Sequence, residues 1–206
     1  MSSGKLISFE GIDGSGKSTQ IKSLQLKFDT LGIKYQTFRE PGGTPLSEKI
    51  RDILLDKENI AMSSISEGLL FAAARAQLVE EHIKPNLNNG KVVICDRFID
   101  STIAYQGYGR GLDVDILKNI NEIATNGLVP DITFVLDIDP DSALKRIGSE
   151  DVDRMESVGI DFFRKIRKGY YEMIDKSPER FFLIDADQSS ENVSFDINKI
   201  IKNIFI

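Results

Sequence analysis

The chain has 206 residues, of which 41% are hydrophobic, and its 32 acidic and 26 basic side chains give a net charge of −6. This length predicts one domain with a sizeable core, and no apolar run is long enough to span a bilayer. The basic residues are scattered, which disfavours a broad nucleic-acid-binding face, and the first residues lack the apolar core of a signal peptide. We therefore expect a single domain, residues 1–206, in the cytoplasm, with neither nucleic acid nor a membrane as partner.

Five short runs rich in β-branched and aromatic residues alternate with longer stretches of helical pattern. Because these runs are apolar without polar alternation, we expect strands covered on both faces, as in a parallel sheet. The sequence thus predicts an α/β fold, with a five-stranded parallel sheet, helices on both faces and ligands at the carboxyl edge. The expected strands span residues 6–10, 35–38, 92–96, 132–138 and 181–184.

The first predicted strand leads directly into an octapeptide of the form G-x-x-x-x-G-K-[ST], and a helical stretch follows it. In this pattern backbone N–H groups wrap phosphate oxygens, Lys17 neutralises the β and γ phosphates, and the Ser18 hydroxyl ligates Mg²⁺. The alternative is a glycine-rich turn without a ligand, but the strand and the helix flank the motif as a nucleotide site requires. We expect ATP to contact Gly11, Ile12, Asp13, Gly14, Ser15, Gly16, Lys17, Ser18 and Thr19.

Local sequence signals predict helix boundaries at three further places. Thr44 precedes Pro45, which predicts a capping hydroxyl before a first-turn proline. The run from Ser64 to Glu67 fits a capping box, and Gly32 follows a helical stretch as a stop signal.

The third predicted strand ends in Asp96, and Arg97 follows it directly. A carboxylate at the end of an apolar strand can hold the metal of a bound nucleotide, and an arginine beside it adds a bidentate phosphate donor. A core strand that ends in a solvated acid is a common alternative. We expect Asp96 and Ser18 to hold Mg²⁺, Arg97 to bind phosphate, and the lone Cys95 to be a small buried hydrophobe.

Nucleotide binding is common to switches, motors and kinases, so the acceptor has to be found elsewhere in the sequence. The base-reading Asn-Lys-x-Asp of a GTPase is absent. A small-molecule kinase needs a second anionic pocket lined by arginines and a lid that excludes water. Arg39, Arg51, Arg75 and Arg154 are candidates, although each could instead be a surface charge. Residues 145–159 are crowded with charges, which predicts a mobile, solvated segment.

Six segments, in matching order and spacing, resemble those of bacterial-type thymidylate kinases (dTMP kinases). They are FEGIDGSGKST from Phe9, FREPGGT from Phe38, LLFAAAR from Leu69, CDRFIDSTIAYQG from Cys95, NGLVPDITFVLDI from Asn126 and DADQSSENV from Asp185. The resemblance runs over nearly the whole chain. It implies a P-loop nucleoside monophosphate kinase-like fold with a short lid at about residues 145–159. It also implies ATP with Mg²⁺ as phosphoryl donor and dTMP as acceptor, giving dTDP on the route to dTTP.

The resemblance assigns roles within the acceptor site. Phe71 would stack on the thymine ring, Arg75 would donate to O4, and Gln106 would bind the O4 and N3–H edge. Tyr105 would fill the space of a ribose 2′-hydroxyl, and Asp13 would accept from the 3′-hydroxyl. The acceptor phosphate would be held by Arg39, Arg51 and Arg97, with Ser101 at the base or phosphate end of the pocket.

The resemblance also implies where the catalytic positive charge comes from. A phosphate oxygen is already anionic, so no general base is needed, and Lys17, Arg97, Mg²⁺ and a lid arginine would neutralise the shifting charge. Family members carry an arginine either in the phosphate loop or in the lid. This phosphate loop has none, so we expect Arg154 to act, with Arg146 second, although Glu150, Asp151 and Asp153 lie between them and either arginine could be a surface charge.

The adenine would lie near residues 185–188, and homodimers would form through the helices between residues 65 and 123, again by resemblance. Two alternatives to a dTMP kinase stay open. One is a kinase of another small acceptor, although Arg75 with Gln106 argues against cytosine or guanine. The other is a regulatory module that only hydrolyses ATP, which would need no second pocket.

Overall fold

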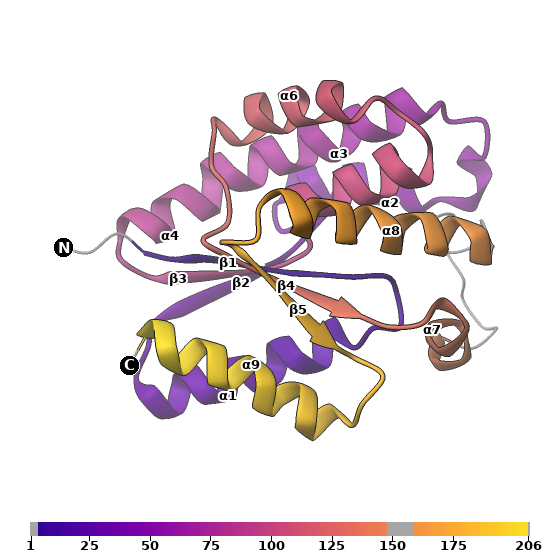
Figure 1. Cartoon of the computed structure of the whole chain (residues 1–206). Coiled ribbons are helices and arrows are strands. Elements are labelled where there is room, and N and C mark those ends of the chain that lie inside the picture. Colours follow the sequence, from indigo (N-terminus) through magenta and orange to yellow (C-terminus); the bar gives the residue numbers. More distant parts are fainter. Residues whose placement is uncertain (1–3, 148–158, 206) are drawn as a thin grey trace.

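Strands and helices alternate along the chain, of which the computed structural model describes residues 4–147 and 159–205 (Figure 1). The strands form one parallel sheet in the order β2-β3-β1-β4-β5, which confirms the predicted sheet. The ends of three strands differ from the prediction by one residue. The strands are β1 (Leu6–Glu10), β2 (Tyr35–Arg39), β3 (Val92–Asp96), β4 (Ile132–Asp137) and β5 (Phe181–Asp185).

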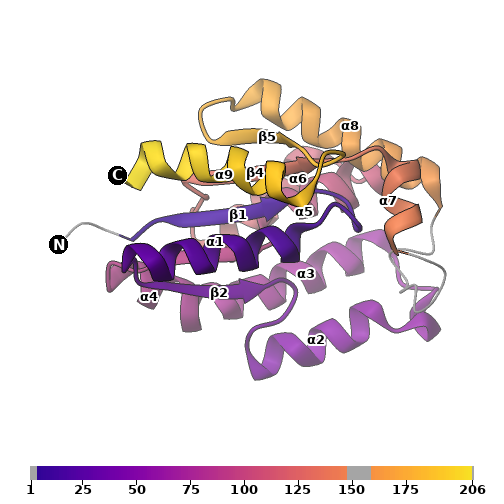
Figure 2. The same ribbon diagram turned by 90° about the horizontal axis from the view of Figure 1, so that it is seen from below.

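Helices cover both faces of the sheet, as predicted (Figures 1 and 2). One face is covered by α1 (Lys17–Leu31) and α9 (Ser190–Phe205). The opposite face is covered by α2 (Pro45–Leu55), α3 (Ser64–Leu78), α4 (Lys84–Asn88), α6 (Val114–Thr125) and α8 (Ile160–Lys176). A short helix, α7 (Pro140–Ile147), lies beyond the carboxyl ends of the strands, and η1 (Lys57–Asn59) is a single 3₁₀ turn. Within residues 4–147 and 159–205 no helix combines the length and apolarity needed to cross a membrane.

Two of the helices continue into π-helical segments. The segment η2 (Val79–Ile83) joins α3 to α4, and η3 (Ile103–Gly109) extends the short helix α5 (Ile99–Thr102). Such segments are rare and often occur at functional sites, because the extra residue per turn redirects side chains. The segment η3 carries Tyr105 and Gln106, two of the predicted site residues.

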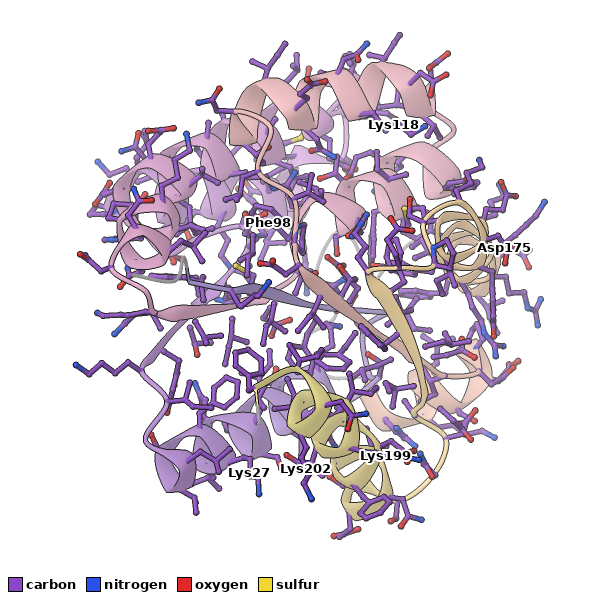
Figure 3. All side chains as sticks on the ribbon, turned by 60° about the vertical axis from the view of Figure 1, so that its left-hand side comes forward. Lys27, Phe98, Lys118, Asp175, Lys199 and Lys202 are labelled. Atoms are coloured by element: carbon purple, nitrogen blue, oxygen red, sulfur yellow. The ribbon has the colours of Figure 1, made fainter. Side chains whose placement is uncertain are left out.

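The core follows the two-residue period of the buried strands. Ile7 belongs to a large cluster that includes the buried side chains of α1 and α9, whereas its neighbour Leu6 belongs to a separate cluster with Val93 and Cys95. Because both faces are covered, all five residues of β1 are buried, although Ser8 and Glu10 give this strand a polar alternation that was not expected from the sequence. Phe98, fully buried, lies between the sheet and the α3 layer, whereas the labelled lysines point outward (Figure 3). Burial raises the pKa of the Cys95 thiol well above its ordinary value, which fits a packing role.

The helix caps are confirmed at two positions and corrected at a third. The Thr44 hydroxyl accepts from the backbone N–H of Ser47, and Gly32, with φ of 67°, ends α1. The predicted capping box is wrong by one residue, because Ser63, and not Ser64, caps α3 by accepting from the Ser66 N–H. Glu67, which the box would have used as a cap, is instead buried and faces another helix.

Candidate active site

The phosphate loop connects the central strand β1 to α1 at the carboxyl edge of the sheet. Gly11 has φ of 131°, and a Cβ there would lie 2.6 Å from the carbonyl oxygen of Leu136. Gly16, with φ of 90°, begins α1, so that the helix N-terminus faces the cavity above the loop. The glycines are therefore required by the backbone of the loop.

Lys17 lies folded over the loop. Its ammonium donates to the carbonyl oxygens of Gly11 and Ile12, each at 3.1 Å. Burial and the neighbouring Arg97 lower the pKa of Lys17 to about 8, against the attraction of nearby carboxylates. The phosphates of a nucleotide would add negative charge beside this buried cation and favour its charged form.

The two predicted metal ligands, a hydroxyl and a carboxylate, lie together beside the loop. The Ser18 Oγ lies 3.3 Å from the Asp96 Oδ2, which joins the start of α1 to the end of β3. In the described ranges, no group of three or more His, Cys, Asp or Glu side chains could hold a metal ion. Two oxygen donors with room for water and phosphate oxygens fit Mg²⁺, which usually binds through few protein ligands.

Arg97 follows β3 in a left-handed conformation, with φ of 70°, which is uncommon for a residue with a side chain. Its Nη1 donates to the Gly11 carbonyl oxygen at 3.0 Å and to the Ser101 Oγ at 3.2 Å. Its Nη2 pairs with the Asp13 Oδ1 at 2.5 Å, and the guanidinium lies over the Tyr105 ring. These contacts fix the guanidinium between the phosphate loop and α5.

Asp13 is bound on both carboxylate oxygens. Its Oδ2 accepts from the Tyr105 hydroxyl at 3.1 Å, opposite the ion pair with Arg97. Burial alone would raise the pKa of Asp13, but Arg97 and Lys17 lower it to about 2. The carboxylate is therefore ionised at neutral pH and offers its remaining lone pairs to a ligand.

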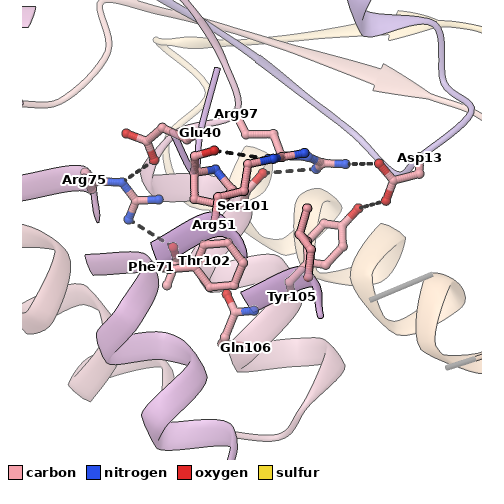
Figure 4. A pocket seen from close by; sticks show the side chains of 12 residues that line it. Asp13, Glu40, Arg51, Phe71, Arg75, Arg97, Ser101, Thr102, Tyr105 and Gln106 are labelled. Carbon is pink, nitrogen blue, oxygen red and sulfur yellow. Dashed lines mark hydrogen bonds and ion pairs between the residues drawn. The ribbon is translucent and has the colours of Figure 1, made fainter. Parts of the chain in front are cut away.

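Two cavities meet at this point. The larger, of about 400 Å³, lies over the phosphate loop, and the smaller, of about 100 Å³, lies between α2, α3 and η3 (Figure 4). The larger is lined by Gly14, Gly16, Lys17, Ser18, Thr19, Arg39, Asp96 and Arg146. The smaller is lined by Pro41, Leu55, Phe71, Arg75, Ser101, Thr102, Tyr105 and Gln106. Asp13, Glu40, Arg51 and Arg97 line both, so a donor and an acceptor can meet there.

Arg75 is fully buried at the end of the smaller cavity. Its Nε donates to the Glu40 Oε2 at 2.7 Å, and its Nη1 donates to Thr102 and Asn121. Its Nη2 donates to the Phe98 carbonyl oxygen at 3.0 Å. Four of the five guanidinium N–H groups are thus used, and the fifth has no partner in the described part of the chain. Arg75 can therefore offer one well-fixed donor to a ligand.

The predicted phosphate-binding arginines occupy different places. Arg51 lines both cavities, and its Nη1 donates to the Pro41 carbonyl oxygen at 3.1 Å. Arg39 lines only the cavity over the phosphate loop, and its exposed guanidinium pairs with Glu48. Arg146, at the end of α7, also lines that cavity, whereas Arg154 lies outside the described residues.

Several buried carboxylates beside the site were missed by the sequence reasoning. Glu40 fixes Arg75 through Oε2, and its buried Oε1 has no hydrogen-bond partner among the described residues. Glu10 accepts from the Phe98 N–H at 2.8 Å and from the Ser101 hydroxyl at 2.5 Å. Glu67 accepts from Gln106. Glu10 lies in the segment FEGIDGSGKST and Glu40 in the segment FREPGGT. Their place in these family-like segments was the one sequence signal that could have indicated them.

A phosphate loop at the carboxyl edge of a parallel sheet, joined to a second polar cavity, defines a P-loop phosphotransferase with the nucleoside monophosphate kinase-like fold. The thymidylate kinase profile matches residues 9–197. The chain belongs to the thymidylate kinase family.

Individual relatives are similar over nearly their full length. The chain is 50% identical to thymidylate kinase of Thermoanaerobacter sp. (strain X514), covering 97% of this chain and 98% of that protein. It is 49% identical to thymidylate kinase of Chlorobaculum tepidum, covering 97% and 96%. The crystal structure of thymidylate kinase from Ehrlichia chaffeensis superposes with a TM-score of 0.77 at 36% identity, covering 97% of this chain and 99% of that one.

Proposed function

We propose that this chain transfers the γ-phosphoryl group of ATP to the phosphate of dTMP, giving dTDP and ADP on the route to dTTP. The observation that carries the proposal is the junction of the two cavities at Asp13, Glu40, Arg51 and Arg97. A donor on the phosphate loop and an acceptor in the smaller cavity would bring their phosphates together at that junction.

The donor phosphates would lie on the phosphate loop, against the N–H groups that begin α1 and against Lys17. The adenine remains assigned to residues 185–188 by resemblance. In this loop the Asp187 Oδ2 accepts from the Asp139 N–H at 3.1 Å, which joins it to the start of α7. This contact holds the loop beside the start of α7.

The acceptor base would be read by one donor and one acceptor. The remaining Arg75 N–H would donate to O4. The Gln106 carbonyl would accept from N3–H, since one N–H of the Gln106 Nε2 donates to Glu67 at 2.9 Å and holds the nitrogen on that side. Phe71 lines the same cavity and would stack on the ring. Tyr105 would lie beside the sugar, and Asp13 would accept from its 3′-hydroxyl.

Transfer needs positioning and charge more than proton chemistry. An acceptor phosphate oxygen attacks the γ-phosphorus, a new P–O bond forms, and the bond to the β–γ bridging oxygen breaks to release ADP. Arg97, fixed by three contacts, would face the transferred group, with Lys17 on the donor side and Arg51 on the acceptor side. Mg²⁺, held beside Ser18 and Asp96, would neutralise charge on the donor phosphates.

Two residues are candidates for the lid arginine that would contact the donor phosphates. Arg146 lines the cavity over the phosphate loop, which supports a role for it at the donor phosphates. Arg154 remains the expectation from the sequence. A single domain of residues 1–206, with a lid at about 145–159, is likewise our proposal.

One assay tests the function against its alternatives. Purified protein with ATP and Mg²⁺ is given dTMP, dUMP, dCMP, dGMP or thymidine, and ADP formation is measured. We expect dTMP to be the preferred acceptor. ADP formation that no acceptor raises above the water background would contradict the kinase and favour a hydrolysing module. Preference for another acceptor would contradict the assignment of the base.

We further propose a homodimer in the cytoplasm. Exposed apolar side chains gather on the outer faces of three neighbouring helices, α2, α3 and α6, and α3 packs between the other two. They are Leu46, Ile53, Ile65, Leu69, Ile116 and Ile123. Such a patch on a charged chain favours a contact with a second copy. The single, buried, free Cys95 fits a reducing compartment.

A further inference from the structure

The amide of Gln106 is held in one orientation by a buried carboxylate on another helix. Gln106 and Glu67 are each 1% exposed, and the Gln106 Nε2 donates to the Glu67 Oε1 at 2.9 Å. A carboxylate in an ion pair accepts hydrogen bonds and donates none. The amide nitrogen must therefore face Glu67, which leaves the carbonyl oxygen to face the cavity that Gln106 lines.

Arg110 holds Glu67 in turn. Its Nε lies 3.2 Å from the Glu67 Oε1, and its Nη2 lies 3.3 Å from the Glu67 Oε2, so the guanidinium spans both oxygens. The other side of Arg110 lies over the ring of Phe162 at the start of α8, 4.9 Å from the centroid. Since the guanidinium is held on both sides, the carboxylate that contacts Gln106 is fixed in position.

The orientation of this amide decides which base edge fits. With its carbonyl toward the cavity, Gln106 accepts a hydrogen bond, and Arg75 donates one from its remaining N–H. Thymine offers the complement, a donor at N3 and an acceptor at O4. Cytosine offers the reverse, an acceptor at N3 and an amino group at position 4. A free glutamine amide could rotate to suit cytosine, but here rotation would turn its carbonyl against the Glu67 carboxylate.

We propose that Glu67, held by Arg110, is a specificity-determining positioning residue that locks the Gln106 amide and so excludes pyrimidines without an N3–H. Glu67 lines neither cavity and acts through Gln106. The inference rests on the proposed function, because it concerns the base of the dTMP acceptor.

The test compares dTMP with 5-methyl-dCMP, which keeps the methyl group and differs only at N3 and at the 4-substituent. The quantity measured is the ratio of the two kcat/KM values. We expect Glu67→Gln, a change of nearly the same shape, to lower this ratio roughly tenfold or more, because an amide at position 67 lets Gln106 rotate. Arg110→Lys, which keeps the charge but loses the two-pronged contact, should lower the ratio in the same direction.

Glu122→Gln is the matched control, since it makes the same chemical change at an exposed position on α6 and should keep the native ratio. A purely structural role for Glu67 would lower both kcat/KM values equally and leave the ratio unchanged. An unchanged ratio in both folded variants, checked by thermal unfolding, would overturn the inference. Turnover of dTMP by the native chain in the same assay tests the proposed function separately.

Discussion

At the scale of single residues, the site divides into groups that serve the transfer and groups that choose the acceptor. Lys17 belongs to the phosphate loop and would meet the donor whatever the acceptor is. Gln106 faces only the smaller cavity and would meet the acceptor base alone. Substitutions at these two positions should therefore have different signatures.

We expect Lys17→Ala to lower kcat roughly 100-fold or more with every acceptor, because it removes a charge that stabilises the transferred group. Gln106→Ala should lower kcat/KM for dTMP by roughly tenfold or more and erode the preference for dTMP over dCMP. ADP formation with each acceptor measures both effects. If the Gln106 variant turned over dTMP as fast as the native chain, Gln106 would have no role in base recognition.

The second prediction at this scale concerns Glu10, which is fully buried beneath the turn that carries Arg97. Burial, followed by the charge of Asp100, raises the pKa of Glu10 from 4.5 to about 7. Between these values the folded chain holds a proton that the unfolded chain has released. The free energy of unfolding should therefore fall as the pH rises from about 4.5 to about 7.

Glu10→Gln removes this titration while keeping the shape of the side chain. We expect the native chain to lose on the order of 1–3 kcal/mol more stability than the variant between pH 5 and pH 8. Urea unfolding at several pH values measures the difference. Parallel pH profiles for the two proteins would show that Glu10 does not titrate in this window.

At the scale of elements, the sequence signals predicted the presence of the helix starts, but they placed the cap of α3 one residue too late. The run from Ser63 to Ser66 holds three serines, so a pattern alone cannot decide which hydroxyl caps α3. In the structure Ser63 is the cap, and Glu67, one turn on, is buried toward η3. Glu67 is therefore used in tertiary packing and does not serve as a cap.

We expect Ser63→Ala to lower the free energy of unfolding by about 1 kcal/mol, because it removes the acceptor for the Ser66 N–H. Ser64→Ala, at the first position inside the helix, is the matched control and should change stability by less than about 0.5 kcal/mol. Chemical denaturation of both variants measures the two values. A larger loss from the Ser64 variant would move the cap back to the position that the sequence predicted.

The π-helical segment η3 could not be predicted from the sequence at all. Its residues alternate small, aromatic and polar types without a period that separates an α-helix from a π-helix. Yet this segment directs Tyr105 toward Asp13 and Gln106 toward Glu67. The sequence therefore named both residues as candidates, but it did not predict the neighbours that fix them.

At the scale of the whole molecule, the sequence predicted the parallel sheet and its ligand edge because buried strands and a phosphate loop leave strong local signals. It did not predict the strand order, which is set by long-range packing. It also did not predict the buried partners of Arg75 and Gln106, Glu40 and Glu67, which lie 35 and 39 residues away along the chain. Such pairs are visible only once the fold brings their elements together.

The last prediction concerns the apolar patch on α2, α3 and α6. Its members recur at helical spacing, with Leu46 and Ile53 on α2 and Ile116 and Ile123 on α6, so each helix presents one apolar stripe outward. Ile123 is 82% exposed, and burying an aspartate there would cost a dimer several kcal/mol. We expect the native chain to sediment as two copies and Ile123→Asp as one, measured by sedimentation equilibrium.

The control is Phe195→Asp, a similar change at a 69% exposed position on α9, on the other face of the sheet, and it should leave the dimer intact. A native chain that sediments as a single copy, or an Ile123 variant that stays paired, would place the contact elsewhere or exclude it.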